Sequence, residues 1–209
     1  MQRKPLTVVN GYCQVIEMMC GNQLDEQCKG YLRETYEGTL RMNRLIDALL
    51  KFSSMAQVEP SRETVDLSGT AQAVAAELAQ AEPHRRVEFR ITEGISVIGD
   101  ANLLRVVLDN LLGNAWKYTG MREEGVIEFG ATEVEGRLTY FVRDNGAGFD
   151  MATADKLFLP FQRLPGAVSE GHGIGLSTVE RIINRLGGRV WAEGEPGKGA
   201  TFYFTLAAD

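Results

Sequence analysis

The chain has 209 residues, 44% of them hydrophobic and 24% charged, and a formal net charge of −6. This is the composition of a globular protein with one large domain, or a large and a small one, and its acidic balance excludes a basic surface for nucleic acid. The sequence contains no uninterrupted run of roughly 18 apolar residues, which is the length that a membrane-spanning helix needs. Cys13, Cys20 and Cys28 lack the spacing of a disulfide framework or a zinc site, which predicts reduced thiols in a cytosolic compartment.

Residues 1 to about 58 have the period of α-helices. Apolar positions in the first segment recur every three or four residues, at Leu6, Val9, Cys13, Ile16 and Cys20. Gly21 and Asn22 predict its end, and Asp25 predicts an N-cap for a second helix whose apolar seam runs from Tyr31 to Ala56. Heptad seams of this length predict a helical hairpin that a second copy completes as a four-helix bundle. Two surface helices on a globular core are the alternative.

The two predicted helices differ in length. The second spans about 30 residues and roughly 45 Å, whereas the first, from Pro5 to Cys20, covers about half of that. The first helix is therefore expected to extend upstream of Met1. Pro5 is equally compatible with a first helical turn, where its missing N–H group costs nothing.

A boundary is expected near Pro60, between a hairpin of residues 1–60 and a second domain of residues 61–209. After a short β-like run, the second domain alternates between two periods. Strands are predicted at 87–91, 95–99, 126–134, 138–144, 188–195 and 200–206, and helices at 67–82, 101–118 and 176–187. The expected fold is α+β, a helical hairpin followed by an α/β sandwich with helices on one face of a mixed sheet.

Polar residues interrupt the otherwise apolar helix predicted at 101–118. Asn110, Asn114 and Lys117 are spaced so that they share one face. Asparagine is a poor residue for a helix interior, but its amide oxygen can ligate Mg²⁺, and lysine offers a point charge to phosphate. A solvated helix face is the alternative and is not excluded by the pattern alone.

Two glycine-rich stretches follow. In "RDNGAGFD" Asp144 ends a strand before Gly146 and Gly148, and a carboxylate there can accept a hydrogen bond from the exocyclic amine of adenine. In "GHGIGLS" the glycines precede a helix, whose N-terminal N–H groups attract phosphate. No lysine follows as in a Walker loop, and no strand leads directly into it as in a dinucleotide fold. Each stretch alone is also compatible with an ordinary turn.

The order of these motifs resembles that of sensor histidine kinases. Residues 66–209 are similar to their ATP-binding catalytic domain, within the wider ATPase group that includes gyrase, and residues 1–58 resemble their dimerisation and phosphotransfer hairpin. The motifs that carry the resemblance are "DNLLGNAWKYT", "DNGAGF", "FLPFQR" (158–163), "GHGIGL" and "GKGATF" (197–202).

The resemblance implies a role for each matching position. Asn114 would ligate Mg²⁺ with Asn110 beside it, Lys117 would contact phosphate, and Tyr118 would flank an adenine held by Asp144. Residues 151–170 would form a mobile lid from which Arg163 reaches the terminal phosphate. The implied nucleotide-binding set is Asn110, Asn114, Lys117, Tyr118, Asp144, Gly146, Gly148, Gly171, His172, Gly173, Gly175, Leu176 and Thr201.

The phosphate-accepting histidine of the family is not found in this chain. Arg3-Lys4-Pro5-Leu6 resembles the end of the acceptor motif, so the histidine is expected immediately upstream of Met1. His84 lies in a polar turn and His172 inside the phosphate loop, and neither suits an acceptor. The chain alone is therefore expected not to autophosphorylate, and Lys4 stands where relatives carry a residue tied to phosphatase activity.

The function implied is that of a kinase core that passes the γ-phosphate of Mg-ATP to a histidine and then to an aspartate of a response-regulator receiver domain. It would act as a homodimer through residues 1–58, with a sensor domain upstream. Two alternatives remain open: a dimeric ATP-binding scaffold without phosphotransfer, and another ATPase or serine kinase of the same group. The heptad seam disfavours the last.

Overall fold

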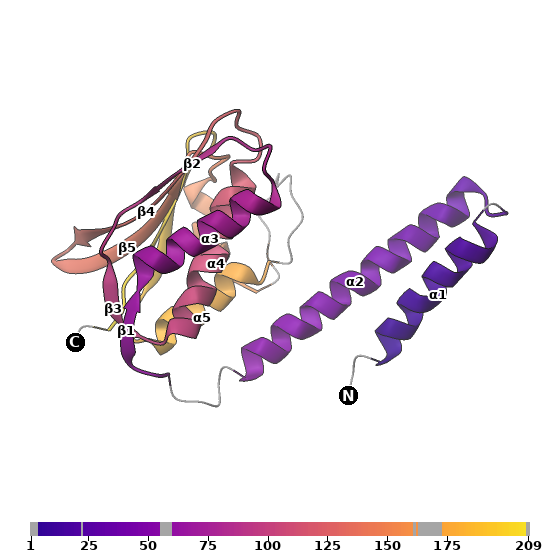
Figure 1. The fold of residues 1–209 in the computed structure, drawn as a ribbon, viewed down its shortest axis with the longest axis horizontal. Helices are drawn as coiled ribbons and strands as arrows, with labels where there is room; N and C mark the ends of the chain where they lie inside the picture. The colour runs from indigo at the N-terminus through magenta and orange to yellow at the C-terminus, as the bar shows by residue number, and fades with distance from the viewer. Residues whose placement is uncertain (1–3, 22, 55–59, 161, 163–172, 208–209) are drawn as a thin grey trace. The chain divides into compact units, whose positions relative to one another are not determined.

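The computed structural model describes residues 4–21, 23–54, 60–160, 162 and 173–207 (Figure 1). By its internal contacts the chain divides into two units, Met1–Val58 and Glu59–Asp209. Each unit has its own architecture. In the described parts of both, no helix is long and apolar enough to cross a bilayer.

The first unit is a helical hairpin of α1 (Lys4–Cys20) and α2 (Glu26–Ser54). The predicted N-cap is confirmed, because the Asp25 carboxylate accepts a hydrogen bond of 2.7 Å from the backbone N–H of Cys28. The predicted difference in length is also observed, with 17 residues in α1 and 29 in α2. Between the helices the Thr39 hydroxyl donates a hydrogen bond to the Asn10 side chain, beside the buried Cys13.

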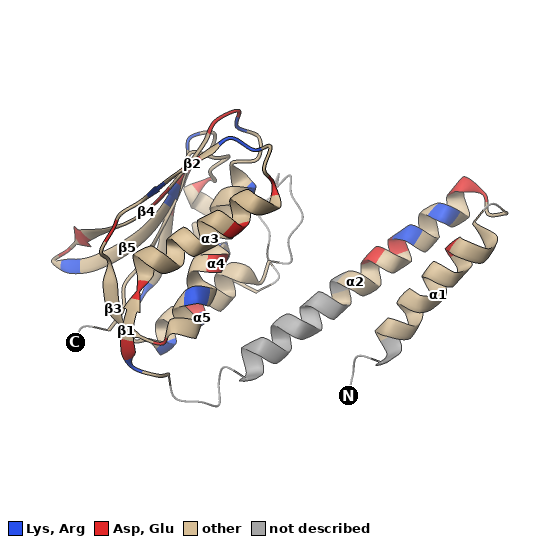
Figure 2. Cartoon of the chain, viewed as in Figure 1, with Lys and Arg blue, Asp and Glu red and all other residues tan. Residues whose placement is uncertain are grey.

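Most of the predicted seam of α1 is exposed in a single copy of the hairpin. Of the seam, Cys13 is 6% exposed, but Val9 is 36% and Ile16 41% exposed. Apolar residues outside the seam are exposed as well, with Tyr12 at 64% and Met18 at 81%. Figure 2 shows that the described part of α1 carries almost no charge. Two packed helices cannot bury apolar residues on every side, so the exposure seen in one copy agrees with the prediction of a hairpin that a second copy completes. Side chains of the seam beyond Met42 lie outside the described residues.

The second unit is built on a mixed sheet. Within the described residues its five strands lie in the order β2-β4-β5-β7-β6; β2 and β4 are parallel and the other neighbours antiparallel. The strands are β2 (Val87–Ile91), β4 (Gly125–Val134), β5 (Arg137–Asp144), β6 (Val190–Glu195) and β7 (Gly199–Phe204).

A separate two-stranded ribbon joins β1 (Glu63–Asp66) to β3 (Ser96–Gly99) in antiparallel pairing. The sequence predicted β3 as a strand but could not assign its partner, because pairing between segments about 30 residues apart leaves no local pattern. The ribbon holds both ends of the segment that contains α3 and β2.

Helices lie on one face of the five-stranded sheet (Figure 1), as the sequence predicted. They are α3 (Leu67–Ala81), α4 (Ala101–Tyr118) and α5 (Gly175–Arg185), with a short 3-10 helix, η1, at Met151–Lys156. Asp66 and Asp100 cap α3 and α4 by accepting backbone N–H groups. Side chains of α4 such as Leu108 and Leu112 are fully buried, as are Phe129, Val142 and Phe204 of the sheet. This core fixes the axis of α4 against the strands.

Candidate functional site

Three segments that are distant in sequence meet on the helix side of the sheet. They are the C-terminal half of α4, the loop that follows β5 and the start of α5. The helices α4 and α5 approach each other closely at Gly175, where a Cβ atom would lie 2.7 Å from the Asn110 side-chain oxygen. Only glycine fits this position without a shift of Asn110, so the second glycine motif and the amide-bearing face of α4 are adjacent.

The polar face of α4 is partly exposed while its other faces are buried. Asn110, Asn114, Lys117 and Tyr118 are all half-buried. The Asn110 side-chain NH₂ group donates a hydrogen bond of 2.7 Å to the Val106 carbonyl, which leaves its oxygen directed at Gly175. The Lys117 ammonium lies 5.0 Å from the centroid of the Tyr118 ring. The structure therefore places these four predicted residues along one accessible edge of the helix.

Asp144 is the most unusual ionisable group of this region. It ends β5 and is only 5% exposed, and its Oδ1 accepts a hydrogen bond of 2.8 Å from the backbone N–H of Gly146. Burial raises the pKa of Asp144 to about 6, and the backbone N–H groups of Gly146 and Ala200 act in the opposite direction. Among the described residues no cation pairs with it. A buried carboxylate with acceptor capacity to spare can bind a ligand donor such as an exocyclic amine.

The first glycine motif is packed tightly on both sides. A Cβ atom on Gly146 would lie 2.5 Å from the Tyr118 carbonyl oxygen, at the end of α4. Gly148 has a positive φ of 63°, and a Cβ atom there would lie 1.9 Å from the Glu195 carbonyl oxygen. The need for glycine at 148 is thus explained by packing against the β6–β7 turn, without invoking a ligand.

The second glycine motif leads into the N-terminus of α5. Gly173 has a positive φ of 66°, and Ile174, which precedes the helix, provides no side-chain cap. The N-terminus of this 11-residue helix, which includes the half-buried Leu176, is the kind of helix end that favours an anion. Gly171, His172 and Arg163 lie outside the described residues, as do Phe161 and residues 164–170 of the predicted lid.

One predicted residue points away from the site. The Thr201 hydroxyl accepts a hydrogen bond of 3.2 Å from Arg143 Nε, on the face of the sheet opposite Asp144. Asp144 pairs with Ala200, and neighbouring residues of a strand face opposite sides. The prediction that Thr201 binds the nucleotide is therefore not supported, since the residue beside Asp144 is Ala200. The sequence signal was the alternation in "ATFYF", in which Ala200 shares the buried face with Phe202 and Phe204 and Thr201 lies on the other face.

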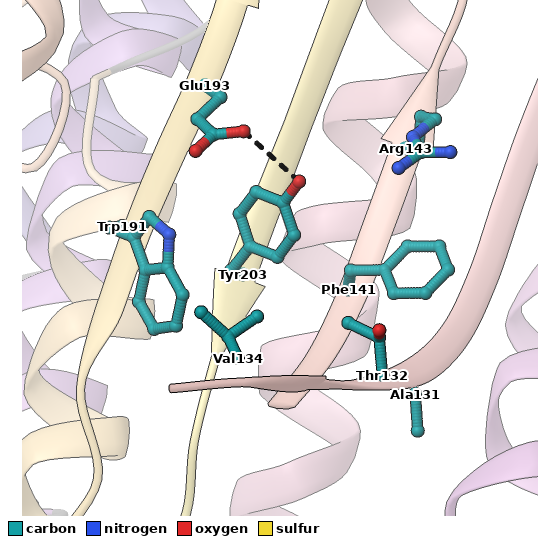
Figure 3. Close-up of a pocket in the computed structure, with 8 residues that line it drawn as sticks. All are labelled: Ala131, Thr132, Val134, Phe141, Arg143, Trp191, Glu193 and Tyr203. Atoms are coloured by element: carbon teal, nitrogen blue, oxygen red, sulfur yellow. Dashed lines mark hydrogen bonds between the residues drawn. The ribbon is translucent and has the colours of Figure 1, made fainter. Parts of the chain in front are cut away.

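The outer face of the sheet holds a cavity of about 460 Å³ (Figure 3). Figure 3 shows the Glu193 carboxylate accepting a hydrogen bond of 3.2 Å from the Tyr203 hydroxyl within it. Its lining residues are Ala131, Thr132, Val134, Phe141, Arg143, Trp191, Glu193 and Tyr203. Arg143 adjoins Asp144 in sequence but belongs to this face, so the cavity is separated from Asp144 by the sheet.

Comparison with known proteins gives an independent assignment. Residues 99–209 match the profile of the family described as histidine kinase-, DNA gyrase B-, and HSP90-like ATPase. The chain is 29% identical over 205 residues to phytochrome-like protein Cph1 of Synechocystis sp., covering 98% of the chain and 27% of that protein. It is 30% identical over 215 residues to the sensor protein kinase WalK of Staphylococcus haemolyticus, covering 99% of the chain and 35% of WalK.

Similarity of structure extends over both units. The crystal structure of full-length ShkA in complex with AMPPNP matches with a TM-score of 0.68 and 27% identity, over 99% of this chain and 44% of ShkA. The chain thus spans between about a quarter and a half of the length of these relatives. The C-terminal half of α4, the loop after β5 and the start of α5 all lie within the matched residues 99–209.

Proposed function

Since the chain belongs to the family of histidine kinase-, DNA gyrase B- and HSP90-like ATPases, with the hairpin and catalytic domain of a sensor histidine kinase core, we propose that it binds Mg-ATP and transfers the γ-phosphoryl group to a histidine. The observation that carries the proposal is the buried carboxylate of Asp144, which adjoins Gly146 where the first glycine motif packs on the end of α4. The carboxylate would accept a hydrogen bond from the adenine amine, and the polar edge of α4 would face the phosphates.

Each residue of the site has a definite task in this proposal. Asp144 accepts a hydrogen bond from the exocyclic amine, and Tyr118 flanks the ring. The backbone N–H groups at the start of α5 hold phosphate oxygens, and Lys117 supplies a positive charge. Catalysis then comes from positioning the γ-phosphoryl group in line with the acceptor nitrogen and from neutralising charge, because phosphoryl transfer needs little covalent chemistry from the protein.

The residues present fit a magnesium ion held mainly by the nucleotide. Within the described residues no group of three or more His, Cys, Asp or Glu side chains could hold a metal. Mg²⁺ keeps several waters and binds phosphates with few protein ligands, and the amide oxygen of Asn114, half-buried on α4, is a suitable one. The bound ion would neutralise phosphate charge as the γ-phosphoryl group leaves ADP.

Neither histidine of the chain suits the role of acceptor. His84 lies in an exposed turn between α3 and β2, and His172, in the second glycine motif, lies outside the described residues. The acceptor proposed is the histidine that the Arg3–Leu6 motif implies, from which an aspartate of a response regulator would receive the phosphoryl group. Exposed apolar residues of α1, such as Tyr12 and Met18, support pairing of two hairpins into a four-helix bundle. A sensor domain upstream and a cytoplasmic location belong to the same proposal.

Two experiments test this function. Isothermal titration of the 209-residue chain with ADP and Mg²⁺ is expected to show saturable binding, and its absence would contradict the nucleotide site. The protein extended upstream through the acceptor motif, incubated with γ-labelled ATP, is expected to acquire acid-labile, base-stable label. Binding without label would instead support an ATP-binding scaffold.

A further inference from the structure

We propose that Arg122 is a positioning residue for the carboxylate of Asp144, and that it acts through the peptide group between Asn145 and Gly146. The inference rests on the proposed function, in which Asp144 binds the adenine amine. Arg122 lies in the loop between α4 and β4, outside the motifs that the sequence analysis identified.

The guanidinium group of Arg122 donates to three backbone carbonyls. Its Nε donates to the Asn145 oxygen at 2.8 Å, and its Nη2 to the Gly146 oxygen at 3.1 Å. Nη2 also donates to the carbonyl oxygen of Gly197, in the β6–β7 turn. A planar guanidinium can donate in several fixed directions at once, whereas a lysine ammonium offers one compact group of donors. Arg122 thus joins two consecutive peptides of the first glycine motif to a turn some 50 residues further along the chain.

The link to Asp144 is a single peptide plane. The Asn145 carbonyl and the Gly146 N–H group belong to the same trans peptide, and they point in opposite directions. The carbonyl accepts from Arg122, and the N–H group donates to Asp144 Oδ1 at 2.8 Å. Hydrogen bonds connected in this way polarise and orient one another. The guanidinium therefore fixes the direction of one of the two backbone donors that hold the carboxylate.

The other donor to Asp144 is the N–H group of Ala200, at the start of β7. The turn that leads into β7 is tied to the glycine motif by the Arg122–Gly197 contact and by the Gly197 N–H group, which donates to the Ala147 carbonyl at 2.7 Å. Arg122 thus contacts the backbone segments from which both donors come. A glycine-rich loop has the greatest freedom to reorient, so an external clamp at this point has the largest effect on the carboxylate.

The experiment compares ADP with inosine diphosphate, which carries oxygen in place of the adenine amine. Both affinities are measured by isothermal titration in the wild-type chain, in Arg122→Met and in Arg122→Lys. Arg122→Met is expected to bind ADP about 10- to 100-fold more weakly, while the affinity for inosine diphosphate changes less than about 3-fold. Arg122→Lys keeps the positive charge but not the planar set of guanidinium donors, and its loss of ADP affinity is expected to be intermediate.

Matched controls separate positioning from general loosening of the fold. Arg90→Met removes an arginine from the outer face of the sheet, where it pairs with Glu88 and Glu128, and is expected to leave both affinities unchanged. Asp144→Asn combined with Arg122→Met is expected to bind ADP no more weakly than Asp144→Asn alone, because both changes disable the same contact.

The outcomes distinguish this inference from the function on which it rests. If the wild-type chain binds both nucleotides equally, Asp144 does not read the amine and the proposed site fails. If the wild type prefers ADP and Arg122→Met keeps that preference, Arg122 does not position Asp144. An equal loss for both nucleotides would mean a purely structural role and would also overturn the inference. Should Arg122→Met fail to fold, the nucleotide preference of Arg122→Lys decides between the same outcomes.

Discussion

The two faces of the sheet differ in chemistry although they are built from adjacent residues. On the helix face Asp144 is buried, without a cation partner among the described residues, and its pKa is raised by burial. On the outer face its neighbour Arg143 is exposed, bonds Thr201 and pairs with Glu128. A solvated ion pair of this kind contributes little to stability. The Asp144 carboxylate, which has no cation partner in the described part of the helix face, is the group that can still accept a hydrogen bond from a ligand.

Of the substitutions that test the difference between the two faces, Asp144→Asn is expected to have the largest effect on ADP affinity. Loss of a charged acceptor to the adenine amine should weaken ADP binding by about 2–3 kcal/mol, or roughly 30- to 150-fold. The ligand-free variant should melt no lower at pH 7, because a neutral side chain removes the desolvation penalty of the buried charge. Calorimetry and circular dichroism measure both quantities.

The control on the opposite face is Glu193→Gln, which removes an acidic group beside Tyr203. It is expected to leave ADP affinity within about 2-fold of the wild type. A larger loss from Glu193→Gln than from Asp144→Asn would assign the nucleotide to the outer cavity.

A smaller effect is expected from Asn114→Asp. The substitution places a carboxylate next to the nucleotide phosphates, so affinity for ATP in the presence of Mg²⁺ should fall about 10-fold, with a smaller change in EDTA. Asn102→Asp, on an exposed position of the first turn of α4, is the matched control and should bind as the wild type does. Equal losses with and without Mg²⁺ would contradict the metal assignment.

Titration of Asp144 should appear in the pH dependence of binding. Its pKa in the free protein is raised to about 6, and the ionised form is the stronger acceptor for the amine. ADP affinity should therefore be nearly constant above pH 7, fall about 2-fold at pH 6 and fall roughly 10-fold at pH 5. The difference between wild type and Asp144→Asn, measured across this range, isolates the contribution of this group. A constant difference would contradict the assignment.

The same carboxylate has the opposite effect on the stability of the free protein. Between its ordinary value of 3.8 and about 6, the folded state binds more protons at Asp144 than the unfolded state does. The contribution of this group to stability therefore decreases as pH rises through that window. As pH rises through this window, ADP binding becomes stronger while the contribution of Asp144 to stability becomes smaller, as expected of a group that serves a ligand.

The smallest effect is expected from Thr201→Val. The Thr201 hydroxyl accepts from Arg143 on the outer face, so its loss should change stability by about 0.5–1 kcal/mol and ADP affinity by less than 2-fold. Chemical denaturation and calorimetry check the two values. A 10-fold loss of ADP affinity would restore Thr201 to the nucleotide site.

Local patterns predicted the elements that local chemistry determines. The strand at 87–91 and the helix at 101–118 were predicted with the bounds that the structure gives, because alternation, periodicity and the Asp100 cap all agree there. The partner of the strand at 96–99 could not be predicted, since it depends on a distant segment. The exposure of the α1 seam in one copy agrees with the predicted hairpin, whose apolar surface a second copy was expected to complete.

The candidate site was predicted in part for similar reasons. An asparagine inside a helix (Asn110), a carboxylate at the end of a strand (Asp144) and a glycine at the start of a helix (Gly175) are unusual in a sequence and were therefore predicted as site residues. The structure brings Asn110 and Gly175 together. Thr201 was assigned without regard to strand alternation, which places it on the outer face. Arg122 was missed because an arginine in a polar loop has no distinctive sequence signal; only its contacts with three carbonyls reveal it.

The most direct test of the account is a crystal structure of the chain with ADP and Mg²⁺. The account predicts the adenine amine within hydrogen-bonding distance, about 2.8–3.2 Å, of an Asp144 carboxylate oxygen on the helix face. A base found instead in the cavity lined by Phe141, Trp191 and Tyr203 on the outer face would contradict it.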